Sequence, residues 1–395
     1  MAERKLAHVE EVVDIQPIEG CDNIVLVTVL GWRVIQRKDT VKVGDKVVYI
    51  EIDSRVPDYN EAFAFLESRK YKVKTLKMRG CISQGLVMTF DQLGLDSSKY
   101  SIGDDMTEKL GITKIETDEE RRLKKDESKN FDNAVQSMKA RHKKLFQNKI
   151  IKKLMRHTWF RKLMFALLGK KNDKPKAFPS YIHKTDETRV ENMPWVLNDQ
   201  EKKWQASEKI DGTSTTFAID CRKKKIEFIV CSRNVRQVDM NQETYHDCGN
   251  TYWEMAYKYD IKNVLTKFRD KYANEYPIII LQGETIGESL QGNPYKMNER
   301  DFYGYNLVLC DPSKGIYQRL GSQTAKKFME EFGVKWVPLL DVVTLPSTMT
   351  EMKSEAEGNS VINPKVLREG IVYRSLDGQE SFKNVSNTYL MKHQE

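Results

Sequence analysis

The stretch Glu208-Lys209-Ile210-Asp211-Gly212-Thr213-Ser214 (EKIDGTS, residues 208–214) places a lysine, an acid and a glycine inside a run that otherwise has the pattern of a β-strand. A lysine beside a carboxylate is common on any protein surface, so these residues alone indicate little. A free lysine has a pKa of about 10.4, and lysine is a nucleophile only when it is unprotonated. A reactive Lys209 therefore requires nearby cations or a metal ion that lower its pKa.

The rest of the chain supplies such groups on separated polar segments that lie beside β-like runs. Carboxylates suit a metal ion, and lysine and arginine suit phosphate oxygens. In chain order the segments are SRN (232–234), QGETIG (282–287), DFYGY (301–305), REGIVY (368–373) and SFKNVS (381–386).

In this order and spacing, the segments resemble the motif series of the covalent nucleotidyltransferases. These are ligases and capping enzymes that carry a nucleoside monophosphate on a lysine. A single KxDG match is weak, but five segments in the correct order are specific. The matching residues are Lys209 and Gly212 in KxDG, then Glu284, then Phe302 with Tyr303, then Glu369-Gly370, and finally Lys383.

A further stretch, FPSYIHKTDETR (178–189), resembles an RNA ligase signature. Together with DNI (22–24), VGD (43–45) and ISQGL (82–86), it is similar to an ATP-dependent RNA ligase family that carries an oligonucleotide-binding (OB) module at the N-terminus. Related DNA ligases and capping enzymes place an OB domain after the last motif, whereas this sequence ends soon after Lys383. The resemblance covers most of the chain and is weakest between about residues 96 and 176.

The resemblance implies ATP-dependent RNA ligation in three steps. Lys209 takes AMP from ATP and releases pyrophosphate, the AMP passes to an RNA 5′-phosphate, and a 3′-hydroxyl attacks the activated end. This is covalent catalysis, which divides one difficult displacement into easier steps. The implied requirements are ATP, a divalent metal ion (Mg²⁺ or Mn²⁺), and a nicked or broken RNA.

The same resemblance implies a role for each candidate site residue. Lys209 is the nucleophile, and Lys383 contacts the α-phosphate, where negative charge develops. Glu284 and Glu369 hold the metal ion, and Asp211 orients a second metal ion or its waters. The other candidates bind the nucleotide: Glu208 at the adenine amino group, Gly212 at a sharp backbone turn, Phe302 or Tyr303 by stacking on adenine, Lys184 and Arg189 on the β- and γ-phosphates, and Arg233 at the ribose or the RNA end.

Each candidate also has a purely structural interpretation. Glutamates at strand ends are often solvated, Asp211 suits a turn, and an aromatic residue in a strand usually packs in the core. Two positions depart from the family pattern. Val385 stands where many ligases have a second lysine, which leaves Lys392 as another candidate cation, and Ser214 stands where some RNA ligases have asparagine.

Residues from about Leu6 to Leu95 have the pattern of short strands separated by turns. The β-branched run 24–30, the turn 43–45 and the runs 47–52, 73–78 and 85–88 carry this pattern. Their spacing predicts a small barrel, for which we favour the OB type. A barrel with only a structural role is the alternative.

The region after the barrel is dominated by charge. Acids and bases crowd residues 116–129, as in a solvated helix or mobile linker. Residues 139–176 hold fourteen Lys and Arg against one acid, a local balance of +13 in a chain of net charge +8, which leaves −5 for the remainder. Apolar residues recur there at helical spacing, which predicts one basic amphipathic helix over 143–169. It suits contact with RNA phosphates; packing on a neighbouring domain or binding at a membrane surface are the alternatives.

From Phe178 onward the pattern is α+β. It predicts strands over 215–219, 226–230, 278–281, 306–310, 370–373 and 380–383, and one helix over 251–274. Neither of the glycine-rich phosphate-binding motifs GxGxxG and GxxxxGK[ST] occurs, so a nucleotide would be bound by residues outside such a loop.

We therefore predict an α+β protein in three parts. These are an N-terminal OB-type β-barrel that binds RNA (1–100), a charged helical linker that contains the basic amphipathic helix (101–176), and a C-terminal nucleotidyltransferase domain of ATP-grasp-like antiparallel sheets with helices (177–395).

Composition limits the class of protein. No apolar run reaches the roughly 18 residues of a membrane span, and the first residues contain acids in place of the apolar segment of a secretory signal. The six cysteines are scattered without a CxxC pair, which favours a reducing compartment. We expect an intracellular monomer, cytoplasmic or nuclear, without stable membrane association.

Two other functions stay open. The first is that of another covalent nucleotidyltransferase, such as a DNA ligase or a GTP-dependent capping enzyme. The second is that of a non-catalytic RNA-binding protein on a ligase scaffold. The presence of Lys209, Glu284, Glu369 and Lys383 favours an active enzyme.

Overall fold

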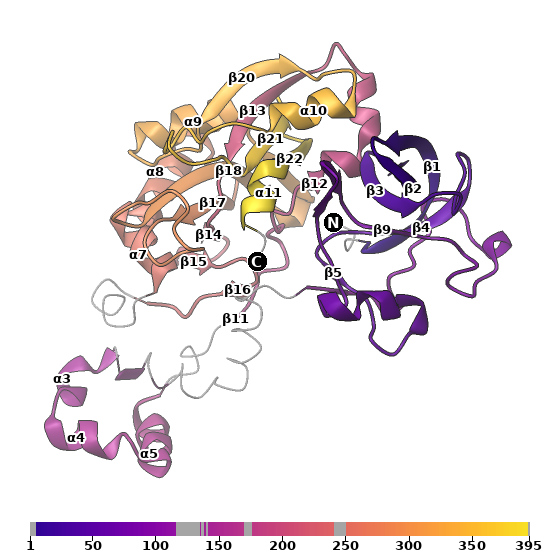
Figure 1. Ribbon diagram of the computed structural model, residues 1–395. Coiled ribbons are helices and arrows are strands. Elements are labelled where there is room, and N and C mark those ends of the chain that lie inside the picture. Colours follow the sequence, from indigo (N-terminus) through magenta and orange to yellow (C-terminus); the bar gives the residue numbers. More distant parts are fainter. Residues whose placement is uncertain are drawn as a thin grey trace.

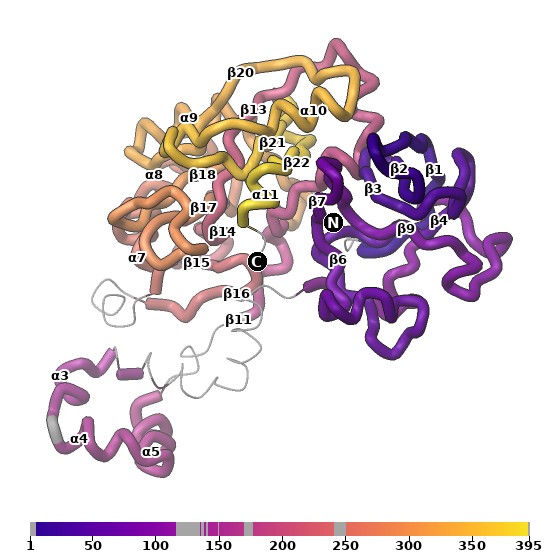
Figure 2. The backbone as a smooth tube through the Cα atoms, in the orientation of Figure 1, coloured from indigo at the N-terminus to yellow at the C-terminus, as the bar shows by residue number. Residues whose placement is uncertain are grey.

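The computed structural model describes residues 5–115, 135, 138–139, 141–169, 176–240 and 250–393. Figure 1 shows the N-terminal strands gathered in one body and the strands and helices after β11 in a second body beside it, with three short helices, α3 to α5, lying apart. Figure 2 follows the backbone through these parts in the same view.

The N-terminal body is the predicted barrel. Its main sheet is antiparallel and five-stranded, in the order β3-β2-β1-β4-β9. The long strand β1 pairs with β2 along one edge and with β4 along the other, and its register with β2 shifts twice. Such bulges bend and twist a strand, which lets the sheet curl. Its strands are β1 (Ala7–Ile18), β2 (Cys21–Val29), β3 (Trp32–Arg37), β4 (Lys46–Ile50) and β9 (Leu86–Met88).

Shorter elements complete this body. The predicted run 73–78 is divided between two strands, and a 3-10 helix that the sequence pattern did not predict follows the cap residue Asn60. These elements are β5 (Ser54–Arg55), η1 (Glu61–Arg69), β6 (Lys72–Val73), β7 (Leu76–Met78), β8 (Cys81–Ser83), η2 (Ser97–Lys99) and β10 (Thr113–Lys114).

The apolar core of the barrel extends beyond residue 100. Met106, Leu110 and Ile112 are buried with Val9 and Phe63 in one cluster, and β10 pairs with β5. The chain therefore leaves the barrel at about residue 115.

The predicted basic helix over 143–169 is not continuous. It consists of α3 (Lys143–Phe146), α4 (Lys149–Leu154) and α5 (Thr158–Leu168). The side chain of Asn148 caps the start of α4 by accepting a hydrogen bond from the Ile150 amide, and a cap of this kind starts a new helix. Apolar spacing predicted the helical character, and the capping residue Asn148 marks the first of the two interruptions.

These three helices bury apolar side chains against one another. Phe146 and Met155 are buried with Val135 and Met138 in a cluster drawn from this segment alone. The predicted linker over 116–129 lies outside the described residues. Of the residues that the structure describes, those from 141 to 169 include no acid.

The C-terminal body contains two sheets. The larger has seven strands in the order β11-β16-β15-β14-β17-β18-β19, and the smaller has five in the order β12-β22-β21-β13-β20. Neighbouring strands are antiparallel except β12 and β22, which are parallel. The strands of the larger sheet are β11 (Lys176–Ala177), β14 (Thr213–Asp220), β15 (Glu227–Cys231), β16 (Val235–Arg236), β17 (Ile278–Ile286), β18 (Asp301–Asp311) and β19 (Ile316–Arg319). Those of the smaller are β12 (Thr188–Arg189), β13 (Lys203–Lys209), β20 (Leu339–Thr344), β21 (Gly370–Ser375) and β22 (Ser381–Val385).

Helices cover these sheets. The predicted helix over 251–274 is two helices, because the chain breaks at Tyr259-Asp260, where Asp260 has a left-handed φ of 49°. The apolar sides of α7, α8 and α9 pack on one face of the larger sheet, and α10 packs on the smaller. The bounds are η4 (Val190–Asn192), η5 (Pro194–Asn198), α7 (Thr251–Lys258), α8 (Ile261–Tyr272), η6 (Pro312–Lys314), α9 (Ser322–Glu331), α10 (Met349–Glu355) and α11 (Asn387–His393). None of the helices described is both long and apolar enough to cross a membrane.

Polar contacts join the barrel to the C-terminal body. The Gly31 amide donates to the Glu191 carbonyl at 2.8 Å, and the Trp32 indole donates to the side chain of Asn192. Asn192 in turn donates to Glu51 of the barrel. Because Gly31 has no side chain, the two backbones can approach: a Cβ there would lie 2.9 Å from the Glu191 Cα.

The Glu51 carboxylate also faces a buried histidine. His8 Nδ1 lies 2.7 Å from Glu10 Oε1, and His8 Nε2 lies 3.6 Å from Glu51 Oε1. Burial by itself would lower the pKa of His8, but the hydrogen bonds and charges of Glu10 and Glu51 outweigh it and raise the pKa to about 9. The imidazolium is therefore a part of the folded structure at neutral pH.

We predict that His8 makes stability depend on pH. A group whose folded pKa is raised contributes stability that is complete below its unfolded pKa, about 6.5, and is lost as the pH rises through about 9. His8→Gln should remove up to about 3 kcal/mol at pH 6 and little above pH 9. Urea unfolding of both proteins across this range measures the difference. The exposed His157→Gln is the control, and an equal effect of both substitutions at every pH would contradict the assignment.

Candidate functional site

The candidate site lies where the chain passes from one C-terminal sheet to the other. β13 of the smaller sheet ends at Lys209, and β14 of the larger sheet begins at Thr213. Gly212 in the connection has no space for a side chain, because a Cβ would collide with the Thr285 carbonyl oxygen and the Ile286 side chain. The sharp turn predicted at Gly212 is therefore tightly enclosed.

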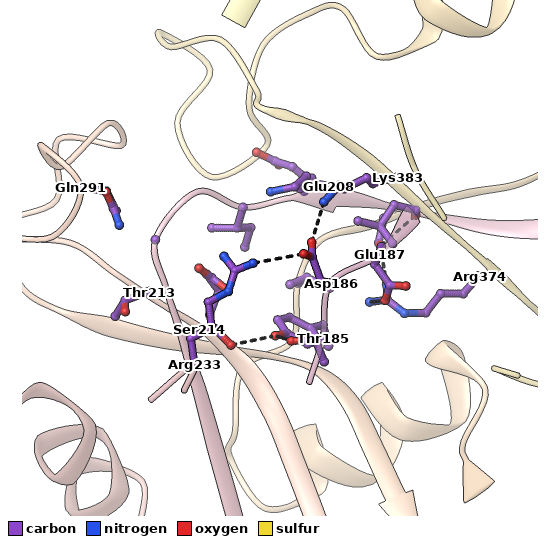
Figure 3. Close-up of a pocket in the computed structure, with 18 residues that line it drawn as sticks. Thr185, Asp186, Glu187, Glu208, Thr213, Ser214, Arg233, Gln291, Arg374 and Lys383 are labelled. Carbon is purple, nitrogen blue, oxygen red and sulfur yellow. Dashed lines mark hydrogen bonds and ion pairs between the residues drawn. The ribbon is translucent and has the colours of Figure 1, made fainter. Parts of the chain in front are cut away.

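A cavity of about 280 Å³ opens beside this connection. Strand pairing explains how distant residues reach it: Lys209 pairs with Gly370, Ser214 with Glu284, and Val372 with Lys383. Figure 3 shows side chains from both sheets pointing into it. Six predicted site residues line it, namely Glu208, Lys209, Gly212, Arg233, Glu284 and Lys383.

Lys209 is paired with a carboxylate. Its Nζ lies 2.5 Å from Glu369 Oε1, and the two side chains are 24% and 16% exposed. Burial by itself would lower the pKa of Lys209, but the negative charges of Glu369, Asp211 and Glu284 outweigh it and hold the pKa above its ordinary value. Without a cation on these acids, the lysine is an ammonium.

The acids around Lys209 are themselves perturbed. Burial raises the pKa of Glu284 to about 8, helped by the charge of Glu369 and opposed by Lys209. Burial also raises the pKa of Glu369. Glu369 Oε2 is buried and has no hydrogen-bond partner among the described residues. A cation beside these carboxylates would lower their pKa values and give the free oxygen of Glu369 a partner.

The described residues contain no ready-made cage of three or more metal-ligating side chains. Magnesium-type ions often use only one or two carboxylates and take their other ligands from water and phosphate. The unpartnered oxygen of Glu369 and the nearby Glu284 fit that kind of site. The side chain of Asp211 accepts from the Tyr389 hydroxyl at 2.6 Å. Neither Asp211 nor Glu369 is among the residues that line the cavity, although the charges of both act on Lys209.

Two cations face each other across Asp186. Lys383 Nζ lies 2.9 Å from Asp186 Oδ1, and Arg233 Nη2 lies 3.3 Å from Asp186 Oδ2. Burial lowers the pKa of Lys383, the positive charges of Lys209 and Arg189 add to this, and Asp186 opposes it. Figure 3 shows both contacts.

Glu208 is one of the residues that line the cavity. Its Oε2 accepts from the Val361 amide at 2.8 Å, while its Oε1 is buried without a partner among the described residues. Burial raises its pKa. The predicted contact with an amino group is compatible with this free acceptor.

A second cavity, of about 970 Å³, adjoins the first on the barrel side and shares Asp186, Glu187 and Lys383 with it. Lys184 and Arg189 line this second cavity. The Lys184 ammonium donates to Asn234 Oδ1 at 3.0 Å. Arg189 lies 3.7 Å from Asp53 of the barrel and over the Trp32 ring.

The position of Phe302 does not suit stacking on adenine. Its ring is fully buried in the core, edge to face with Phe217, and covers Gly283. Tyr303 is half-buried beside Lys335 and lines neither cavity. The aromatic residue that lines the first cavity is Tyr305, which hydrogen-bonds to Thr185 at 2.7 Å.

A bulge explains this difference. Gln282 pairs with Asn306 and Gly283 with Gly304, so Tyr305 is an extra residue in β18. The bulge interrupts the alternation of side chains that underlies a sequence-based choice between Phe302 and Tyr303. Lys392, the substitute cation suggested by the sequence, is exposed on α11 and lines neither cavity.

Sequence reasoning missed other residues of the first cavity. Arg374 is buried, and it approaches Glu187 at 3.5 Å. Asp186 and Glu187 stood in the quoted stretch 178–189 without a role. The available signal for Arg374 was strand alternation, because it lies two residues after Val372 on β21 and both line the cavity.

The chain is similar to known proteins in sequence and in fold. A family model described as an OB-fold domain matches residues 6–90, and one described as RNA ligase matches residues 202–390. A structure of a Naegleria gruberi RNA ligase variant with ATP and Mn is 30% identical, with a TM-score of 0.73 over 99% of each chain. A variant with AMP and Mn and a structure with PPi are each 29% identical, with TM-scores of 0.74 over 99% of each chain. No curated protein matches significantly.

The chain belongs to the RNA ligase family. This confirms the predicted family, and the OB-fold match confirms the type of the N-terminal barrel. The roles of individual site residues remain predictions.

We predict that Phe302 stabilises the fold as a residue of the apolar core. Phe302→Ala should lower the free energy of unfolding by about 3–5 kcal/mol, because it leaves a large cavity beside Phe217. Denaturant unfolding measures the loss. Phe65→Ala, which removes the same ring from a position that is 58% exposed, should change it by less than about 1 kcal/mol. Equal stability of the two variants would show that Phe302 is not a core residue.

Proposed function

We propose that this protein is an ATP-dependent RNA ligase that joins a 3′-hydroxyl to a 5′-phosphate through a Lys209–AMP intermediate and an AMP-capped RNA. The observation that carries the proposal is the contact of Lys209 Nζ with Glu369, because Lys209 lines the first cavity together with Glu284 and Lys383. RNA repair or nick sealing is the task that we propose for this activity.

In the first step, the Lys209 amine attacks the α-phosphorus of ATP, an N–P bond forms, and the bond to pyrophosphate breaks. Lys209 has to lose a proton first, and the acids around it oppose that loss. A divalent ion held by Glu369 and Glu284 would neutralise their charge and that of the phosphates, which lowers the pKa of Lys209. Lys383, on the same cavity wall, would stabilise the charge that develops on the α-phosphate.

We propose that the nucleotide lies with its adenine at Glu208 and its phosphates toward the second cavity. The free Glu208 Oε1 would accept from the adenine amino group. Tyr305, in place of Phe302 or Tyr303, is the aromatic residue beside the nucleotide. Lys184 and Arg189 line the adjoining cavity, where they would contact the outer phosphates, and Arg233 would contact the ribose or the RNA end.

In the later steps, the AMP would pass to an RNA 5′-phosphate, and a 3′-hydroxyl would then displace AMP. The second cavity joins the Lys383 site to the barrel, so it offers RNA a route between the two bodies. We propose that residues up to about 115 form an RNA-binding OB domain, residues 116–176 a connecting segment, and residues 177–395 the nucleotidyltransferase domain. The five cysteines of the described part are free thiols, in keeping with the reducing, intracellular location that we propose. We also propose that the protein is a monomer.

The first test is covalent labelling. Incubation with ATP and Mg²⁺ or Mn²⁺ should add one AMP to the chain, as measured by intact mass, and Lys209→Ala should abolish the addition because it removes the accepting nitrogen. Lys203→Ala, which removes an exposed lysine from the same strand, is the control. Labelling that persists without Lys209, or labelling by GTP alone, would refute the proposal. Sealing of matched nicked RNA and nicked DNA then tests the substrate.

We also propose that the helical segment α3 to α5 holds RNA. Lys152, Lys153 and Arg156 are exposed there, and Trp159 is 62% exposed. Cationic side chains beside an exposed aromatic ring are a common means of binding single strands.

Salt dependence tests this contact. Replacing Lys152, Lys153 and Arg156 by Gln should reduce the slope of log affinity for RNA against log salt by about 2 to 3, since each lost phosphate contact removes about 0.7–0.9. The matched control removes three exposed charges from another surface, Lys223, Lys224 and Lys225. Equal slopes for the two triple variants would exclude these helices from RNA binding.

A further inference from the structure

Asp186 lines both cavities, and Figure 3 shows it among the residues of the first. One carboxylate oxygen meets the Lys383 ammonium at 2.9 Å, and the other meets the Arg233 guanidinium at 3.3 Å. Its side chain is 43% exposed, whereas that of Lys383 is 17% exposed. An acid therefore joins the two cations on which the proposed function relies.

This arrangement resembles the way in which these cations would hold a phosphate. Both carboxylate and phosphate present several acceptor oxygens to ammonium and guanidinium donors. In the structure, Asp186 already forms ion pairs with Lys383 and Arg233 and offsets their positive charge. A phosphate that reached Lys383 and Arg233 would compete with this carboxylate for the same donors.

We propose that Asp186 is a resident counterion of the phosphate site, which the nucleotide displaces and which thereby limits nucleotide affinity. This inference rests on the proposed function, because it takes the first cavity as the nucleotide site. Asp186 is a positioning residue here, since it acts through Lys383 and Arg233.

The burial of Lys383 explains why such a counterion is present. A buried ammonium without a partner is costly, and it tends to lose its proton. Burial, Lys209 and Arg189 all lower the pKa of Lys383, and the charge and hydrogen bond of Asp186 act against them. Asp186 thus favours the charged form of Lys383 while the site is empty.

The Asp186 side chain can also move away from Lys383 and Arg233. A carboxylate that is nearly half exposed gives up an ion pair at a modest cost, because water solvates it. It faces the second cavity as well as the first, so it can turn aside when a phosphate takes its donors.

The next residue provides a matched control. Glu187 lines the same two cavities, but its partners are different: Arg374 at 3.5 Å, Arg319 at 3.9 Å, and the Ser381 hydroxyl. Neutralising Glu187 changes the net charge of the cavities as much as neutralising Asp186 does. It leaves the contacts of Asp186 with Lys383 and Arg233 in place.

The test is equilibrium binding to the full chain with Lys209 present. The α,β-methylene analogue of ATP is used as the probe, because its α,β bridge cannot be cleaved. Asp186→Asn should bind this analogue and pyrophosphate about 2- to 30-fold more tightly than the unsubstituted protein, the range expected for the loss of two partly exposed ion pairs that are each worth about 1.4- to 5-fold. Adenosine, which has no phosphate, should bind equally to both. Asp186→Ser is a second variant with the same expected direction.

The outcomes separate this inference from the proposed function. Equal or weaker binding of the analogue by both Asp186 variants would overturn the inference, and so would an equal gain in Glu187→Gln or a gain that extends to adenosine. Binding of the analogue by none of the proteins would instead refute the nucleotide site itself.

Discussion

The contact between Lys209 and Glu369 is the constraint on which the C-terminal half of the structure depends. A buried ion pair seldom stabilises a fold, because desolvation offsets the attraction, and separating its partners is costly. The sheets therefore have to hold both residues in place. Pairing of β13 with β21 puts Lys209 opposite Gly370, so that Glu369 meets the ammonium. The neighbouring strand β22 carries Lys383, and β17 of the other sheet carries Glu284. Charged side chains of both signs thus gather beside one small cavity at the junction of the two sheets.

Much of this could be predicted from the sequence, because its motifs follow one another in the order of a known family and several of the matching residues stand at or near strand ends. Lys209 closes β13, Arg233 follows β15, and Glu369 precedes β21. The residues that sequence reasoning missed depend on tertiary pairing. Asp186 reaches Lys383 because β12 lies parallel to β22, with Arg189 opposite Lys383. Nothing in the local pattern of the stretch 178–189 indicates that partner, and a lone short strand gives no register.

The remaining differences have local causes that periodicity does not encode. One extra residue in β18 brings Tyr305 to the cavity while Phe302 faces the core. One capping asparagine, Asn148, interrupts the basic helix, and the left-handed backbone of Asp260 divides the helix after Thr251. Apolar spacing predicted the type of structure in these segments. Bulges, caps and positive φ angles determined where each element bends or ends.

The barrel contributes to the site through its contact with the C-terminal body. Trp32 and Glu51 hold Asn192, and Asp53 and Trp32 face Arg189 a few residues earlier. The short segment from Arg189 to Asn192 is therefore fixed on one side by the barrel and on the other by β22. Since Lys383 belongs to β22 and lines both cavities, any movement of the barrel that shifted β12 would alter the cavity beside Lys209. The polar contacts at Gly31, Trp32 and Asn192 consequently do more than attach a separate domain, because they determine where Arg189 stands relative to Lys383.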